Sequence, residues 1–269
     1  MADYFRFQEY GTFRADAVVD VLRGDLLGVV FRQAVSAEVC ATLAERFRSS
    51  PALRVRGSDA PGHYLGAYHY HKTTEGYLDE SAAARAALTR VLDLPDDPLA
   101  RIRAQLGRVL AEDGVTFRTA RHAGREAGLA LIRSWHGRGA FALAPHEDRA
   151  QCREPRQADF EIQRIADRPV GAMNLCLENG TGGRLRVWDL EPDDALRDRL
   201  GLTYTGSPYP MAELDGVESC TLDVGPGDVY FFNGAHVHAV EPERDPAARR
   251  TTLSGLLGFI DERTVVSWT

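Results

Sequence analysis

The chain has 269 residues, of which 44% are hydrophobic and 26% charged, the composition of a folded globular protein with material for a sizeable core. Its formal net charge of -7 argues against nucleic-acid binding, because a surface that follows phosphates needs clustered positive charge. No apolar run is as long as a membrane span, and the N-terminus lacks the pattern of a signal peptide. We therefore expect a cytoplasmic protein that binds neither membrane nor nucleic acid.

The first part of the chain, residues 1–128, is predicted to be mainly helical with short strands. Apolar residues recur with helical spacing, as Val39, Leu43 and Phe47 do after Ser36. The predicted helices cover residues 16–22, a stretch beginning at Ser36, residues 81–92 and residues 98–110, and a buried strand covers residues 26–31.

Residues 61–77 differ from the rest of this first part and are predicted to form a loop. Tyrosines and histidines interleave here with glycines, at Tyr64, Tyr68, Tyr70, Tyr77, His63, His69 and His71. Exposed aromatic side chains on loops often serve binding, so this segment could cover a site as a lid, or simply pack as a loop.

The second part, residues 129–269, is predicted to be rich in short strands separated by turn residues. The predicted strands cover residues 129–135, 171–177, 184–188, 218–222, 228–232, 237–240 and 252–260, with a short helix over 190–200 and a loop over 203–214. Residues 178–183 form a turn rich in residues that tolerate positive φ. This spacing predicts an antiparallel sandwich or barrel, with the whole chain 1–269 as one domain.

Cysteine spacing gives no sign of a disulfide framework or a zinc site. The four cysteines, Cys40, Cys152, Cys176 and Cys220, are scattered along the chain without a close pair. No pattern in the sequence indicates an oligomeric state.

The pattern His-x-Asp at His146 and Asp148, followed by His238, indicates a metal site. Two imidazoles and one carboxylate can cover one face of an octahedral metal and leave the other face open, as in non-haem Fe(II) oxygenases. On extended backbone, residues two apart point to the same side, so His146 and Asp148 can act together. A single histidine near a strand is more often a packed or surface residue, and only the combination favours a metal site.

From residue 136 to the C-terminus the chain resembles the 2-oxoglutarate/Fe(II)-dependent oxygenases. The matching segments are PHED, GDVYFFNGAHVHAVEP and RRTTLSGLLGF. The resemblance implies a double-stranded β-helix (a jelly-roll, cupin-like barrel) over residues 129–269, with the N-terminal helices packed on it. It also implies that His146, Asp148 and His238 bind Fe(II), with 2-oxoglutarate and O2 as co-substrates.

The same resemblance implies that an arginine about a dozen residues after the distal histidine pairs with the far carboxylate of 2-oxoglutarate. Arg250 fits this role, because a planar fork of donors meets a carboxylate in a bidentate pair. Thr252 lies two residues on and could support the same carboxylate, while Arg249 competes if the strand register slips by one. His236 shares the periodicity of His238, but the family pattern His-Ala-Val-x-Pro selects His238.

Other residues are weaker candidates for the pocket. Asn174 could donate to the co-substrate or substrate, or occupy an ordinary half-buried strand position. Arg133 could pair with an anionic substrate group, although a surface arginine is the commoner outcome. Trp135, Tyr68 and His69 are further candidates for the pocket wall, and Trp188 is expected in the core or the wall.

The resemblance implies hydroxylation of an unactivated C–H bond in a small molecule, coupled to decarboxylation of 2-oxoglutarate to succinate and CO2. The chain is similar to bacterial enzymes that tailor amino-acid derivatives and natural-product intermediates, and is related to freestanding aliphatic halogenases. Those halogenases carry Gly or Ala where this chain has Asp148, which favours hydroxylation here. The alternatives are desaturation, epimerisation or cyclisation by the same oxidant, a zinc hydrolase, and a non-catalytic cupin-like metal binder.

Overall fold

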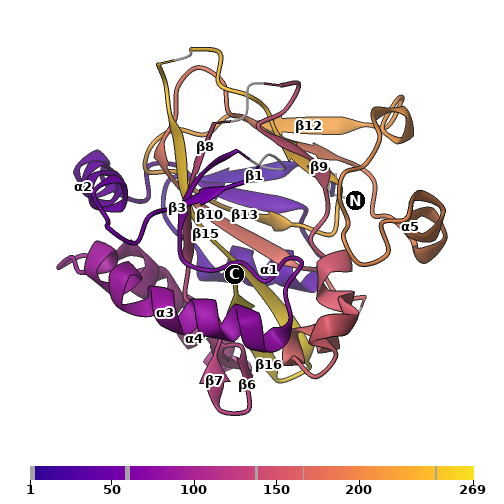
Figure 1. Ribbon diagram of the computed structural model, residues 1–269, viewed down its shortest axis with the longest axis horizontal. Helices are drawn as coiled ribbons and strands as arrows, with labels where there is room; N and C mark the ends of the chain where they lie inside the picture. Colours follow the sequence, from indigo (N-terminus) through magenta and orange to yellow (C-terminus); the bar gives the residue numbers. More distant parts are fainter. Residues whose placement is uncertain (1–3, 58–60, 137–138, 166, 246) are drawn as a thin grey trace.

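A computed structural model describes residues 4–57, 61–136, 139–165, 167–245 and 247–269 (Figure 1). Within these residues the strands form sheets of ten, four and two strands. The strands are β1 Phe7–Tyr10, β2 Gly28–Phe31, β3 Arg54–Arg56, β4 Gly62–Leu65, β5 Thr116–Thr119, β6 Arg121–His122, β7 Arg125–Glu126, β8 Leu131–Trp135, β9 Leu143–His146, β10 Gly171–Glu178, β11 Leu185–Trp188, β12 Ser219–Leu222, β13 Val229–Asn233, β14 His238–Val240, β15 Arg250–Asp261 and β16 Thr264–Trp268. The helices are α1 Ala15–Arg23, α2 Ala37–Arg48, α3 Thr74–Leu92, α4 Pro98–Glu112 and α5 Asp194–Leu200, with short 3-10 turns η1 Ala150–Arg153, η2 Pro155–Gln157, η3 Glu161–Ile165 and η4 Met211–Glu213.

The central strands β2, β13 and β10 of the ten-stranded sheet are buried on both faces, which explains their nearly continuous apolar sequences. Its main path is β1-β2-β13-β10-β15-β8-β4-β3, and β16 and β5 continue from the far half of β15. In β13, Val229 and Phe231 pack toward the helices, whereas Tyr230 and Phe232 point to the opposite side. Most neighbouring strands are antiparallel, and β1–β2 and β16–β5 are parallel.

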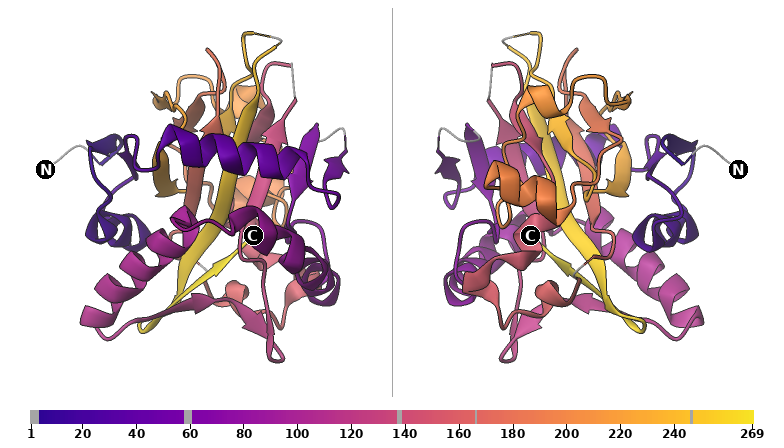
Figure 2. Two further views of the ribbon diagram at one scale, coloured as in Figure 1. Left: turned by 90° about the vertical axis from the view of Figure 1, so that its left-hand side faces the viewer. Right: turned by 90° about the vertical axis from the view of Figure 1, so that its right-hand side faces the viewer.

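Helices α1 to α4 cover the outer face of this sheet (Figures 1 and 2). Helices α1, α2 and α4 begin within about a residue of their predicted starts, whereas α3 begins at Thr74, seven residues before its predicted start at residue 81. The Ser36 side chain caps α2 by accepting from the Val39 amide, and Asp97 caps α4 ahead of Pro98. Helix α1 ends at Gly24, which adopts a left-handed φ of 83°. No helix in the described ranges has the length and apolarity needed to cross a membrane.

The four-stranded sheet has the order β12-β11-β14-β9 and faces the inner side of the large sheet across a cavity of about 130 Å³. Strands of both sheets line this cavity: β8, β10, β13 and β15 from the large sheet, and β9, β11 and β14 from the small one. The turn at residues 178–183 carries the chain from one sheet to the other, since β10 and β11 do not pair with each other.

The loop prediction for residues 61–77 is wrong at both of its ends. Residues 62–65 form β4, where a Cβ on Gly62 would lie 2.1 Å from the Ser134 carbonyl oxygen, so glycine marks a close strand approach rather than a turn. Helix α3 begins at Thr74, capped by Thr73, and includes Tyr77, which is fully buried. Within the predicted loop, residue 61 and residues 66–73 lack regular structure.

The expectation of a mainly helical first part omitted most of its strands. Strands β1 to β5 all come from residues 1–128, and all of them join the large sheet. Only β2 was expected, because strands of three or four mostly polar or mixed residues carry little apolar periodicity. The N-terminal part therefore extends the sheet as well as covering it.

Candidate active site

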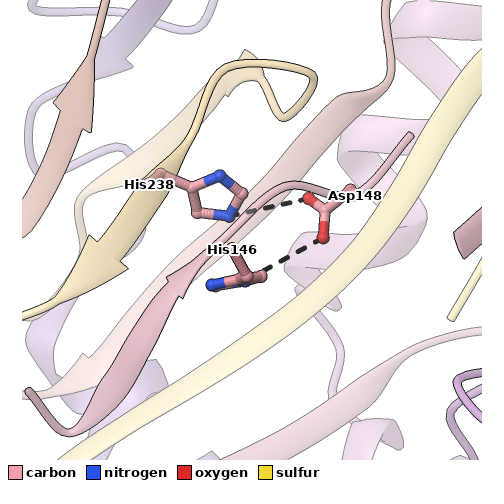
Figure 3. A group of neighbouring side chains, drawn as sticks. All are labelled: His146, Asp148 and His238. Atoms are coloured by element: carbon pink, nitrogen blue, oxygen red, sulfur yellow. Dashed lines mark ion pairs between the residues drawn. The ribbon is translucent and has the colours of Figure 1, made fainter. Parts of the chain in front are cut away.

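His146 and His238 lie opposite each other on two neighbouring strands of the small sheet. They are Cα partners in the antiparallel β9–β14 pair. Asp148 follows β9, and its backbone amide donates to the Gly234 carbonyl at 2.7 Å, which ties it to the turn before β14. The three side chains point toward one another (Figure 3).

The three residues are close enough to share one metal ion. Each offers a ligand atom within 4.8 Å of the other two, and all three are buried. Asp148 carboxylate oxygens lie 4.0 Å from His146 Nε2 and 3.7 Å from His238 Nε2. No other group of this kind occurs among the described residues.

Hydrogen bonds orient both imidazoles with Nε2 toward the centre. His146 Nδ1 donates to the Ala144 carbonyl at 2.8 Å, and His238 Nδ1 donates to the His236 carbonyl at 2.9 Å. A carbonyl only accepts, so each Nδ1 carries the proton and each Nε2 presents its lone pair.

Burial adjusts the protonation of all three groups. It lowers the pKa of His238 to about 4 and that of His146 well below its usual value, so both rings are neutral at pH 7. Burial raises the pKa of Asp148 to about 7, opposed by the positive charge of Arg133. Neutral imidazoles and an ionisable carboxylate are the forms that bind metal.

Gly234 makes room for the Asp148 carboxylate. A Cβ at residue 234 would lie 2.4 Å from Asp148 Oδ2 and 3.2 Å from the Val170 carbonyl oxygen. A side chain at this position would therefore displace the carboxylate. Glycine is required here because the Asp148 carboxylate lies so close to the backbone, and not because the backbone makes a turn.

The residue between the two N-terminal ligands, Glu147, points away from the cavity into a buried ion pair. Its Oε1 accepts from Arg197 Nε at 2.9 Å, and both side chains are almost fully buried. The Glu147 carboxylate also accepts from the Ala150 amide at 2.9 Å. Arg197 belongs to α5, so this helix holds the His-x-Asp segment in place.

Arg250 begins β15 and lines the cavity beyond the triad. It is buried, its Nε donates to the Gly183 carbonyl at 2.6 Å, and its Nη2 donates to the Tyr230 hydroxyl at 3.1 Å. Arg249 is exposed and lines a separate surface hollow. Of the two arginines considered from sequence, only Arg250 reaches the cavity.

The remaining candidates divide between the cavity and its surroundings. Arg133, Trp135, Asn174, Tyr68 and His69 line the cavity. Thr252 is fully buried, does not line the cavity, and its Oγ1 has no hydrogen-bond partner among the residues described.

The structure places His236 and Trp188 outside the proposed metal site. His236 does not share a strand face with His238, because it lies in the turn before β14 begins. Its ring contacts the Trp188 carbonyl and Glu191 instead, so the expectation of a shared face was wrong. Trp188 belongs to a hydrophobic cluster with Val237 and Ala239.

Sequence reasoning missed several residues of the cavity wall. In the sequence, Tyr230 is one of several aromatic residues in a predicted buried strand. In the structure, its hydroxyl contacts Arg250. Alternation in β13 gave a usable signal, since Tyr230 and Phe232 share the inner face. Arg56 and Ser207 lie far from any motif, and no sequence signal pointed to them.

Comparisons with known proteins show the class to which the chain belongs. L-isoleucine 3(1)-dioxygenase of Pantoea ananatis (strain AJ13355) is 32% identical over 254 residues, which cover 91% of this chain and 84% of the relative. The crystal structure of an N-substituted L-amino acid dioxygenase from Burkholderia ambifaria AMMD superposes with a TM-score of 0.59 at 16% identity, over 95% of this chain and 91% of that one. The epimerase SnoN from nogalamycin biosynthesis, in complex with Fe3+, alpha ketoglutarate and nogalamycin RO, gives 0.50 at 14% identity, over 91% and 85%.

The chain is therefore an enzyme of the 2-oxoglutarate/Fe(II)-dependent oxygenase superfamily, and the resemblance seen in its motifs is confirmed. Within it, residues 8–269 match the family described as carrier-protein-independent halogenase WelO5, to which the chain belongs. The expected cofactor Fe(II) and co-substrates 2-oxoglutarate and O2 are confirmed with the superfamily. The alternatives of a zinc hydrolase and of a non-catalytic binder lose their support.

Proposed function

We propose that the enzyme hydroxylates an aliphatic carbon of an amino acid or a close derivative, with decarboxylation of 2-oxoglutarate to succinate and CO2. The observation that carries this is the convergence of His146, Asp148 and His238 in a cavity that also contains Arg250. The substrate class follows from relatives whose names specify L-isoleucine and N-substituted L-amino acids.

In this proposal the Nε2 atoms of His146 and His238 and the carboxylate of Asp148 hold the ferrous ion. The donor set fits, because two neutral imidazoles and one carboxylate suit Fe(II) and leave coordination positions open. The bound iron and its co-substrates supply the oxidising chemistry. The protein orients the rings through Ala144 and His236, and it encloses the site between two sheets.

Arg250 is proposed to bind the far carboxylate of 2-oxoglutarate. A buried guanidinium beside the Tyr230 hydroxyl is suited to a charge-assisted pair. The amide of Asn174, which lines the cavity, is proposed as a further polar contact for the co-substrate, whereas Thr252 does not line the cavity.

We further propose that the chain 1–269 is one domain whose two facing sheets form the double-stranded β-helix of the superfamily. The strands that the first part adds to the large sheet support this.

Asp148 favours oxygen insertion over halogenation. Halogenases that resemble this chain carry Gly or Ala at the corresponding position, and the carboxylate occupies the space that a halide would need. The family to which the chain belongs is named after a halogenase, so this residue decides between two outcomes within one family. Desaturation, epimerisation and cyclisation use the same oxidant and differ in the product.

The test combines purified enzyme, Fe(II), 2-oxoglutarate and O2 with L-isoleucine, other aliphatic L-amino acids and their N-acetyl derivatives, in chloride-containing buffer. We expect succinate release that depends on one of these substrates, and a product that has gained one oxygen atom by mass spectrometry. A chlorinated product, or a product that has lost two hydrogens, would contradict hydroxylation. Absence of substrate-dependent succinate across the panel would contradict the substrate class.

A further inference from the structure

Arg133 is a cation in the cavity that forms no ion pair with any described residue. It lies in β8 and lines the cavity on the same face as Trp135. Its Nη2 donates to Ser254 Oγ at 3.5 Å, its guanidinium carbon lies 4.6 Å from the centre of the Trp135 ring, and its buried Nε has no hydrogen-bond partner. None of the carboxylates in the described part of the chain forms an ion pair with it.

The buried positive charge of Arg133 requires a negative charge nearby. Burial lowers the pKa of Arg133 to about 9; the positive charges of Arg56 and Arg250 act in the same direction, and the Asp148 carboxylate and Tyr230 oppose them. Two other buried arginines near the site do have acidic partners: Arg197 pairs with Glu147, and Arg149 pairs with Glu191. An unpaired buried charge is strongly unfavourable unless a ligand meets it.

The co-substrate does not supply this partner when it binds as proposed. The negative charge of one 2-oxoglutarate carboxylate balances the positive charge of Arg250. The other 2-oxoglutarate carboxylate and the Asp148 carboxylate together balance the two positive charges of the ferrous ion. Arg133 then remains as one uncompensated positive charge, which calls for one further anionic group in the cavity.

We propose that Arg133 binds the carboxylate of the substrate, so that the enzyme acts on amino acids whose carboxyl group is free. This inference rests on the proposed function and specifies its substrate class.

The strand register keeps the two arginines apart as separate anion sites. In the β8–β15 pair, Trp135 lies opposite Arg250 and Arg133 lies opposite Thr252. The Trp135 ring is in contact range of both guanidinium groups, at 4.6 Å from Arg133 and 5.9 Å from Arg250. Arg250 already donates to Gly183 and Tyr230, whereas the donors of Arg133 are largely unused and can meet a carboxylate in a bidentate pair.

The test measures binding to the iron-loaded enzyme without oxygen. The probes are L-isoleucine and N-acetyl-L-leucine, each beside its carboxamide, followed by calorimetry with and without 2-oxoglutarate. The wild-type enzyme should bind at least one acid about tenfold or more tightly than the matching amide. Arg133→Gln should remove this preference, and Arg133→Lys should restore part of it, because the charge returns without the planar fork.

Arg250→Gln is the matched control. It should weaken 2-oxoglutarate and preserve the preference for acid over amide, whereas Arg133→Gln should leave the dissociation constant of 2-oxoglutarate within about threefold. The proposal is overturned when Arg133→Gln weakens 2-oxoglutarate as Arg250→Gln does, because Arg133 then serves the co-substrate. It is also overturned when wild type binds acid and amide equally, or binds 2-oxoglutarate but none of the probes.

Failure of the proposed function gives a different result. In that case 2-oxoglutarate does not bind to the iron-loaded wild-type enzyme, and the comparison of acid with amide in its absence still decides whether Arg133 is an anion site.

Discussion

The proposed metal ligands depend on neighbours that carry no metal-binding atoms. Gly234 is the sharpest case, because its missing side chain leaves the space that the Asp148 carboxylate occupies. Gly234→Ala should displace that carboxylate and weaken Fe(II) binding about tenfold or more, the usual size of a disturbance just outside the ligand shell.

Titration of Fe(II) into the metal-free Gly234→Ala variant measures this effect. Gly225→Ala is the control, since a Cβ there would meet nothing within 4 Å. Equal iron affinity in both variants would mean that the carboxylate adapts and that Gly234 is not required.

Asp148 is the proposed ligand on which hydroxylation depends. Asp148→Ala removes one of three ligands and its negative charge, so substrate hydroxylation should be lost and Fe(II) binding should weaken. Product analysis of the variant, alongside Fe(II) titration, checks both effects. Full retained turnover would remove Asp148 from the metal site.

At the scale of elements, helix α5 stabilises the metal-binding segment through one buried ion pair. Arg197→Gln would leave the Glu147 carboxylate buried without its cation, which typically costs about 3 kcal/mol or more. Chemical denaturation should show this loss. The double variant Glu147→Gln with Arg197→Gln should regain part of it, and a loss below about 1 kcal/mol in the single variant would contradict the role of the pair.

The segment at residues 66–73 carries a buried histidine that makes stability depend on pH. Burial lowers the pKa of His69 to about 4, so between about pH 6.5 and 4 the unfolded chain binds a proton that the folded chain does not. Stability should therefore fall as the pH falls through this window, by about 3 kcal/mol from His69 alone.

Comparing the metal-free wild-type protein with His69→Asn isolates the contribution of His69 to stability. His146 and His238 also have lowered pKa values, but they are present in both proteins, so their effects cancel in the difference. The difference in unfolding free energy between them should shrink toward low pH and level off below about pH 4. A difference that does not change with pH would show that His69 is not held neutral.

Elements with strong periodicity were predictable from sequence, and short polar strands were not. Helix α4 begins at Pro98 as predicted, and the apolar strands β10 and β13 lie within about a residue of their predicted positions. Strand β3, Arg54–Arg56, is charged and pairs only at the sheet edge, so its sequence has no pattern to detect.

In the site, too, the residues that stand in local motifs were predictable, and those placed by tertiary contacts were not. His146, Asp148, His238 and Arg250 stand in motifs with fixed spacing, and the structure brings all four to one cavity. Tyr230 is separated in sequence from the residues it serves, and the position of His236 depended on where β14 begins. Pairing between distant strands determines such contacts, and local sequence does not encode it.

At the scale of the whole molecule, two facing sheets bring distant segments around one cavity. The small sheet carries the two histidines, and the large sheet carries Arg133 and Arg250. The groups proposed to bind the metal and those proposed to bind carboxylates thus come from opposite walls. A co-substrate that spans from iron to Arg250 would bridge the two sheets.

The central claim, that iron and 2-oxoglutarate bind together at this cavity, is tested most directly by anaerobic titration. Wild-type enzyme should develop a weak visible charge-transfer band only when Fe(II) and 2-oxoglutarate are both present. Arg250→Ala should need about thirtyfold or more 2-oxoglutarate for the same band, because a buried charge pair is lost, while Arg249→Ala should behave as wild type. Absence of the band in the wild-type enzyme, with tight binding of Zn(II) instead, would contradict the assignment.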